Sequence, residues 1–170
     1  METSEALEFL ARHQPMPDDE HLDQTTMDTY EAVRKHFLEH YDERCVPLFL
    51  GSFGEGSGWG VYQLVEDVLR EYPRDLVRKA LDDCLQSPHS GVRKWCLQIA
   101  MEYEDPALLR HFRRMLSSDD VDERIWSAYN IDLVGTVDDR PLVEEALRSE
   151  TDADVREILE RWLQREGTSQ

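Results

Sequence analysis

Hydrophobic positions between residues 73 and 104 recur at helical spacing in two short stretches with a turn between them. Apolar residues repeat about every three to four positions over 75–86 and again over 92–103, which predicts two amphipathic helices. Pro73 stands where the first helix begins, a position at which proline is well tolerated. This stretch is therefore predicted to form a helical hairpin.

The hairpin pattern returns along the chain at intervals of 31 or 32 residues. Two sets of equivalent positions show the interval, one in the first helices and one in the second: Cys84, Met115 and Ala146, and Arg93, Arg124 and Arg156. A fixed period of about 20–50 residues is typical of solenoids and helical arrays. We therefore expect a right-handed α-solenoid of about four helical hairpins, in which Cys84 and Met115 are both largely inaccessible.

The rest of the chain also reads as helices and loops, so the predicted fold class is all-α. The expected helices span residues 4–12, 24–42, 44–53, 61–72, 75–86, 92–103, 106–116, 121–133, 141–149 and 155–164. No stretch alternates apolar and polar residues between hairpin turns, as strands would. We expect one domain overall, in which residues 1–43 form N-terminal helices packed on a repeat region at 44–166.

The charge balance narrows the choice of partner. The 170 residues include 37 acids and 19 bases, for a formal net charge of −18. Binding to a nucleic-acid backbone requires clustered lysine and arginine, so nucleic acid and anionic membrane surfaces are not expected partners. A strongly acidic protein instead favours fast capture of a basic protein. The sequence leaves the oligomeric state open.

Cysteine usage and the N-terminus indicate a reducing compartment. The three cysteines, Cys45, Cys84 and Cys96, form no C-x-x-C motif, and the last two fall on helix faces predicted to be buried. The first 13 residues lack the basic and apolar regions of a signal peptide, and no run of 18 apolar residues occurs. We expect a cytoplasmic protein.

The repeat region resembles a known class of helical repeats. The short hairpin period, the prolines at Pro73 and Pro106, and the Val-Arg starts at Val92 and Val155 are similar to HEAT-like repeats of the short, phycobilisome-lyase type. The glycine-rich stretch, followed by GVYQLVEDVL, GVRKWCLQIA and ERIWSAYNI, resembles HEAT-type immunity proteins of bacterial polymorphic toxin systems. That resemblance implies a protein that binds and neutralises a toxin domain.

Motifs for catalysis or cofactor binding are weak. The glycine-rich stretch 51–60 fits neither nucleotide-binding glycine pattern, and it reads either as a flexible turn or as a mobile recognition loop. His36 and His40 match H-x-x-E-H and share a helix face, but nothing selects a third zinc ligand. No nucleophile elbow occurs, and paired acids such as Asp82-Asp83 are typical of solvated helix ends. We expect no enzyme activity, no cofactor and no metal.

The second helices of the hairpins suggest a partner surface. Counted from Tyr62, Arg93, Arg124 and Arg156, positions +3 and +7 are mostly apolar and predicted to face the core. The opposite positions would form a row through Asp67, Gln98, Tyr129 and Arg161. Candidate partner contacts on this side and at the glycine-rich loop are Glu55, Trp59, Glu66, Asp67, Lys94, Trp95, Gln98, Ile125, Trp126 and Tyr129. Trp95 and Trp126 could instead pack between repeats.

Three functions follow from these patterns. The first is a non-enzymatic binding protein that covers a basic, toxin-like partner with an acidic face. The second is a general HEAT-repeat adaptor or scaffold. The third is a HEAT-type chromophore lyase, which rests on the repeat length alone because no bilin site is evident.

Overall fold

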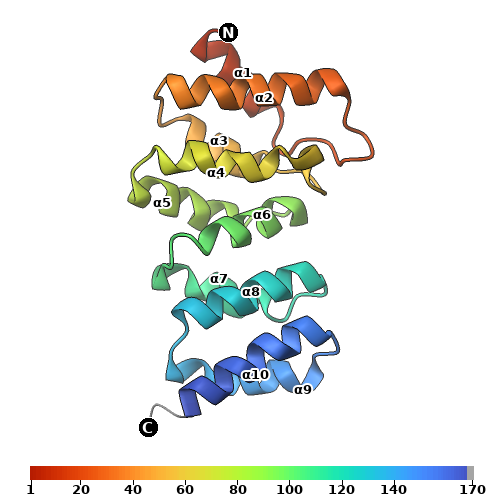
Figure 1. Ribbon diagram of the computed structural model, residues 1–170, viewed down its shortest axis with the longest axis vertical. Helices are drawn as coiled ribbons and strands as arrows, with labels where there is room; N and C mark the ends of the chain where they lie inside the picture. Colours follow the sequence, from red (N-terminus) through yellow and green to blue (C-terminus); the bar gives the residue numbers. More distant parts are fainter. Residues whose placement is uncertain (168–170) are drawn as a thin grey trace. The chain divides into compact units, whose positions relative to one another are not determined.

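The protein is all-helical, as predicted. The computed structural model describes residues 1–167, with side chains to 165, and no strand occurs in that range. Figure 1 shows successive helices joined by turns and, at residues 13–23, by a longer loop. The chain divides into two compact units, Met1–Cys96 and the residues from Leu97 on. The predicted solenoid stacking and the division at residue 43 stay predictions.

The first unit contains the N-terminal helices and the first two predicted hairpins. Its elements are α1 (Thr3–Arg12), α2 (Gln24–Glu39), α3 (Cys45–Gly51), the 3-10 turns η1 (Gly58–Gly60) and η2 (Tyr62–Leu64), α4 (Val65–Arg70), α5 (Arg74–Cys84) and the start of α6 (Ser90–Ala100). The expected helix at 61–72 therefore begins as a 3-10 turn. Pro47 lies in the first turn of α3, where proline is tolerated.

Aromatic side chains form the core of this unit. Tyr30 of α2 meets Phe49 and Tyr62 edge to face, with ring centroids 6.0 and 5.7 Å apart. Its hydroxyl shares a 2.8 Å hydrogen bond with the buried Ser52 hydroxyl, and burial raises the pKa of Tyr30 well above its ordinary value. These contacts bury α2 against α3 and the segment after the glycine-rich loop.

The second unit holds the later hairpins. Its elements are the end of α6, η3 (Pro106–Leu108), α7 (Leu109–Met115), α8 (Val121–Val134), η4 (Val137–Asp139), α9 (Arg140–Ser149) and α10 (Ala153–Gly167). The predicted helix at 106–116 thus divides into η3 and α7. Both α7 and α10 pack against α8, and α10 also packs against α9.

The repeat register is partly confirmed by burial. Met115 is 3% exposed, as predicted, and positions +3 and +7 are buried except for the half-buried Leu163. The expectation that Cys84 is largely inaccessible is wrong, because this residue ends α5 and is only half-buried. Ala146 is also half-buried because it lines a surface hollow of about 310 Å³.

One arginine contact recurs in three hairpins and shows their equivalence. The guanidinium of Arg93 donates to the Ser87 carbonyl at 2.8 Å, and Arg124 donates to Ser118 at 2.9 Å. Arg156 donates to the Glu150 backbone carbonyl at 3.0 Å. In each hairpin the acceptor stands six residues before the arginine, in the turn after the first helix. Carbonyls at a helix end lack intrahelical partners, so these arginines join the two helices of each pair.

Candidate protein-binding surface

Asp19 holds the glycine-rich loop against the segment that follows α1. Its carboxylate accepts hydrogen bonds from the backbone N–H groups of Ser57 and Gly58, at 2.9 and 2.8 Å. The Asp19 N–H donates to the Glu55 carbonyl at 3.1 Å, and the Met16 N–H donates to Ser52 at 2.8 Å. These bonds hold residues 51–60 in one conformation, which differs from both interpretations from sequence, the flexible turn and the mobile recognition loop.

The N-terminal half of α6 holds the other side of the same loop. The Trp95 indole donates to the Gly56 carbonyl at 2.9 Å, and Lys94 forms a 2.8 Å ion pair with Glu55. Ser90 also donates to the Glu55 carboxylate. The Trp95 ring stacks on Phe53, with ring centroids 5.5 Å apart, so this tryptophan packs within the unit.

Two glycines allow these segments to approach each other. A Cβ at Gly54 would lie 2.6 Å from the Met16 carbonyl oxygen and 2.7 Å from that of Pro17. A Cβ at Gly91 would lie 2.4 Å from the Gly54 carbonyl oxygen. Both clashes are with backbone atoms, so neither can be relieved by a side-chain rotation.

We therefore expect Gly91→Ala to lower the free energy of unfolding of the first unit by about 1–3 kcal/mol, the cost of overpacking. The loop should also move away from α6 and expose the Ser57 and Gly58 amides. Urea unfolding and hydrogen exchange of these amides measure the two effects. His89→Ala, two residues earlier at an exposed position, is the control. Unchanged exchange in Gly91→Ala would show that the close contact does not hold the loop.

Trp59 is presented outward by this loop. It adopts the left-handed conformation, with φ 51°, between Gly58 and Gly60, which also have positive φ. Its side chain is 48% exposed. A large residue rarely adopts this conformation, so the surrounding bonds must hold it there at a cost of about 1–3 kcal/mol. The loop therefore fixes the backbone of a large aromatic residue whose side chain is half-exposed.

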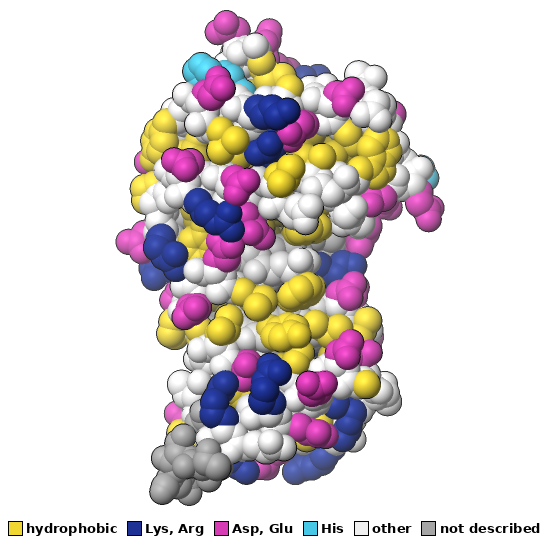
Figure 2. Space-filling view, in the orientation of Figure 1, with side chains coloured by type: hydrophobic (Ala, Val, Ile, Leu, Met, Phe, Trp, Pro, Cys, Tyr) yellow, Lys and Arg dark blue, Asp and Glu magenta, His cyan; other side chains and the backbone are white. Residues whose placement is uncertain are grey.

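The charge of the first unit is unevenly distributed along the chain. Residues 1–43 include twelve acids and three bases, whereas residues 44–96 include seven of each. In the described part of the chain, only Glu31 and Asp42 of those twelve acids form ion pairs. Figure 2 shows hydrophobic side chains gathered over the η1 end of the loop, with acidic side chains beside them. Asp18 and Glu20, on either side of Asp19, are both exposed.

The three acids that the sequence predicted to contact the partner form ion pairs within the first unit. Glu55 pairs with Lys94, and Glu66 and Asp67 pair with Arg70 at 3.1 and 2.8 Å. The surplus negative charge of this unit comes from residues 1–43, because residues 44–96 are balanced.

The other candidate contacts lie on the second unit. Gln98, Ile125, Trp126 and Tyr129 are all half-buried, and the rings of Trp126 and Tyr129 lie 5.8 Å apart. Leu133, one turn after Tyr129 on α8, is exposed. Of these residues, those on α8 give the helix a partly exposed set of apolar side chains. The row through Asp67, Gln98, Tyr129 and Arg161 spans both units and stays a prediction.

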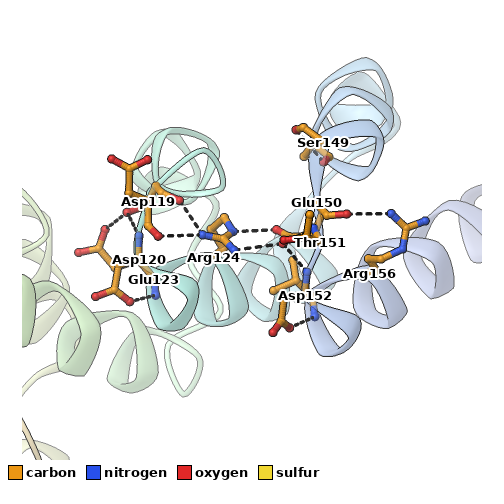
Figure 3. A network of polar contacts seen from close by, with 12 residues as sticks. Asp119, Asp120, Glu123, Arg124, Ser149, Glu150, Thr151, Asp152 and Arg156 are labelled. Carbon is orange, nitrogen blue, oxygen red and sulfur yellow. Dashed lines mark hydrogen bonds and ion pairs between the residues drawn. The ribbon is translucent and has the colours of Figure 1, made fainter.

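A network of hydrogen bonds and ion pairs connects the turns of the second unit. Figure 3 shows Arg124 between the α7–α8 turn and the α9–α10 turn. Its guanidinium donates to both Glu150 oxygens, at 2.7 and 3.1 Å, in addition to its bond to Ser118. The Glu150 carboxylate also accepts the Thr151 and Asp152 N–H groups at 2.9 Å. Because these groups satisfy one another, we interpret the network as a structural link between hairpins.

The two histidines of the H-x-x-E-H motif both lie within hydrogen-bonding distance of other groups of the first unit. His36 Nε2 lies 2.9 Å from the Thr3 hydroxyl, and His40 Nδ1 lies 3.0 Å from the His36 carbonyl oxygen. Burial and the neighbouring His40 lower the pKa of His36. Among the described residues, no group of three or more histidine, cysteine, aspartate or glutamate side chains could hold a metal ion.

Asp19 is the residue of the candidate surface that sequence reasoning did not find. It stands 38 and 39 residues before the two amides that it binds. Its acidic neighbours indicate only a solvated loop, so no local pattern distinguishes it.

The candidate function of this chain rests on the geometry described above. No helix in the described residues is long and apolar enough to cross a membrane. No protein-family model matches the chain, and no curated protein matches it either.

Proposed function

We propose that this chain is a non-enzymatic binding protein that captures a basic protein partner on the surface formed by Trp59 and the acids of residues 1–43. The observation that carries the proposal is Trp59, which is half-exposed and held in a left-handed conformation in the loop that Asp19 binds. Within the described residues, the histidine motif lacks a third metal ligand. Of the paired acids, Asp120 caps α8 and Asp139 forms an ion pair with Arg113. A binding role therefore accounts for more of the geometry than a catalytic one.

Trp59 has the properties of an interface anchor. Tryptophan is enriched among the residues that dominate binding energy, where it enters a pocket on the partner. A loop whose backbone is already held in one conformation loses little conformational entropy on binding. The bonds from Asp19 and α6 to the loop therefore support affinity without contacting the partner themselves.

The acids of residues 1–43 would act mainly on the rate of association. Asp18, Glu20 and the exposed acids of α1 have no ion-pair partner among the described residues, so their charge extends into solvent. Complementary charge steers a partner toward such a surface and raises the association rate constant. It also disfavours nucleic acid and other polyanions.

The resemblance to HEAT-type immunity proteins supports a narrower proposal for the partner. Proteins of that kind neutralise a toxin domain by covering it. A basic toxin domain would match both the acid surplus of residues 1–43 and the aromatic anchor. We therefore propose that the partner is a toxin-like protein whose basic surface this chain covers.

The test is affinity capture from the native host with the wild-type chain, followed by binding kinetics of the purified partner. We expect the association rate constant to fall about tenfold or more as salt rises from about 0.05 to about 0.5 M. Trp59→Ala should raise the dissociation rate constant about 30-fold or more, equivalent to a loss of about 2 kcal/mol or more. Asp18→Asn with Glu20→Gln should instead lower the association rate constant.

Leu133→Ala, which truncates an exposed apolar residue on the second unit, is the matched control for Trp59→Ala. Tyr129→Ala tests whether the partner reaches the second unit, since an anchor there would also act on dissociation. An acidic partner, or association that does not change with salt, would refute the proposed mechanism. A partner lost in Leu133→Ala but retained in Trp59→Ala would place the surface elsewhere.

A further inference from the structure

Another surface hollow lies on the first unit, where α3 and α5 pack against each other. Its volume is about 250 Å³, and it is lined by Pro47 of α3 and by Leu76, Lys79, Ala80 and Asp83 of α5. This lining shares no residue with the surface proposed for the protein partner, which is formed by Trp59 and the acids of residues 1–43. The hollow is therefore a separate candidate site.

The lining combines three apolar side chains with one cation and one anion. Leu76 is half-buried and Ala80 is 6% exposed, so packing holds both in place. Lys79 and Asp83 are exposed, and their spacing of four residues places them on one face of α5. The stem of a lysine side chain can cover apolar surface while its ammonium group stays in water. A molecule in the hollow therefore meets apolar surface and one charge of each sign.

Both charges can be reached by a molecule from solvent. Neither Lys79 nor the Asp83 carboxylate forms a hydrogen bond or an ion pair within the part of the chain that the structure describes. On the same helix, Arg78 does pair with Asp75, at 3.6 Å. A lysine that precedes its acid by four residues is the less favourable order for an ion pair on a helix. The two charges are therefore left to contact a ligand.

The end of α5 gives a cation a further reason to bind beside Asp83. The last turn of this helix includes Asp82 and Asp83 and no basic residue. The carbonyl end of a helix carries partial negative charge, which stabilises cations and disfavours carboxylates. An ammonium group of a ligand is therefore attracted both by the Asp83 carboxylate and by the helix end.

We propose that this hollow binds free α-amino acids with aliphatic side chains, such as leucine. The ammonium group of the ligand contacts the Asp83 carboxylate, and its carboxylate contacts the Lys79 ammonium group. The aliphatic side chain lies against Pro47, Leu76 and Ala80. An α-amino acid matches this arrangement because both of its charges are attached to one carbon and its side chain extends away from them. Lys79 and Asp83 likewise stand about one helical turn apart, beside the apolar lining.

NMR titration of the isotope-labelled full chain with L-leucine, at neutral pH and constant ionic strength, tests the site. We expect a dissociation constant on the order of 1 mM, because so small a ligand on an open surface gains little free energy. The amides of Leu76, Ala80 and Asp83 should shift, and the leucine methyl groups should show Overhauser contacts with the Ala80 methyl group. Glycine, which keeps both charges and lacks the side chain, should bind at least about fivefold more weakly.

Matched removal of single charges distinguishes this site from a non-specific apolar contact. N-acetyl-leucine lacks the ammonium group and leucinamide lacks the carboxylate, so each should bind the wild-type chain about threefold or more weakly than leucine. Asp83→Asn should weaken leucine and leave N-acetyl-leucine unchanged. Lys79→Gln should weaken leucine and leave leucinamide unchanged. Arg78→Gln, which removes an exposed cation of α5 that does not line the hollow, is the control and should bind leucine as the wild type does.

Three outcomes would overturn the proposal. The first is the absence of shifts at a leucine concentration tenfold above the expected dissociation constant, and the second is a set of shifts centred outside α3 and α5. The third is an equal loss of leucine and N-acetyl-leucine binding in Asp83→Asn. Because these experiments use no protein partner, their result is independent of the proposed function.

Discussion

Replacing Met115 with aspartate is expected to unfold the second unit. Met115 is 3% exposed and ends α7, which packs against α8. The substitution places a carboxylate among apolar side chains and also removes the methionine packing. Burial of an unpaired charge is among the most destabilising changes known, and we expect a loss of about 4 kcal/mol or more. That is a large fraction of the roughly 5–15 kcal/mol that stabilises a typical domain.

Circular dichroism during urea denaturation measures this loss. Val137→Asp is the matched control because it introduces the same side chain on the same unit at a residue that is 52% exposed. It should change stability by no more than about 0.5 kcal/mol. A Met115→Asp chain as stable as this control would show that the repeat register does not define the core.

Arg124→Met is expected to destabilise the second unit by about 3 kcal/mol, the lower end of the range for removing one partner of a buried ion pair. The Glu150 side chain is 4% exposed, and the Arg124 side chain is 17% exposed. The substitution leaves the Glu150 carboxylate poorly solvated and without the guanidinium. It also removes the bond from Arg124 to the Ser118 carbonyl.

The effect of Arg124→Met should depend on pH. Hydrogen bonds from Arg124 are the main reason that the pKa of Glu150 lies below its ordinary value. A lowered pKa in the folded state stabilises the protein fully above the unfolded-state value of about 4.3, and the contribution is lost as pH falls through the folded-state pKa. The stability difference from wild type should therefore be largest near neutral pH and shrink below about pH 4.

Arg148→Met provides the control for this experiment. Arg148 pairs with Glu145, but both side chains are about 70% exposed, at 69% and 71%. Such surface pairs contribute about 0–1 kcal/mol, so this variant should stay close to wild type at every pH. Equal losses in the two variants would contradict a special role for the Arg124–Glu150 link.

The sequence by itself determined the helical hairpins, because periodicity is a local property. Apolar spacing, the prolines at helix starts and the recurring arginines indicated where helices lie and which face is buried. Met115 and the +3 and +7 positions followed from this register. Cys84 departed from it because a helix end has fewer covering neighbours than its spacing implies. The 3-10 turns at Tyr62 and Pro106 also escaped prediction, since they continue the same apolar pattern with different hydrogen bonds.

Only the tertiary structure decided how the candidate site is built. Asp19 binds amides 38 and 39 residues later, and Lys94 pairs with Glu55 across 39 positions. Such contacts depend on how helices pack, and no spacing rule specifies them. The sequence showed how many acids the chain has, but folding decided which of them are paired. The sequence also identified Trp59 as a candidate anchor. The conformation of the loop that exposes Trp59 depends on bonds from two distant segments, Asp19 and α6.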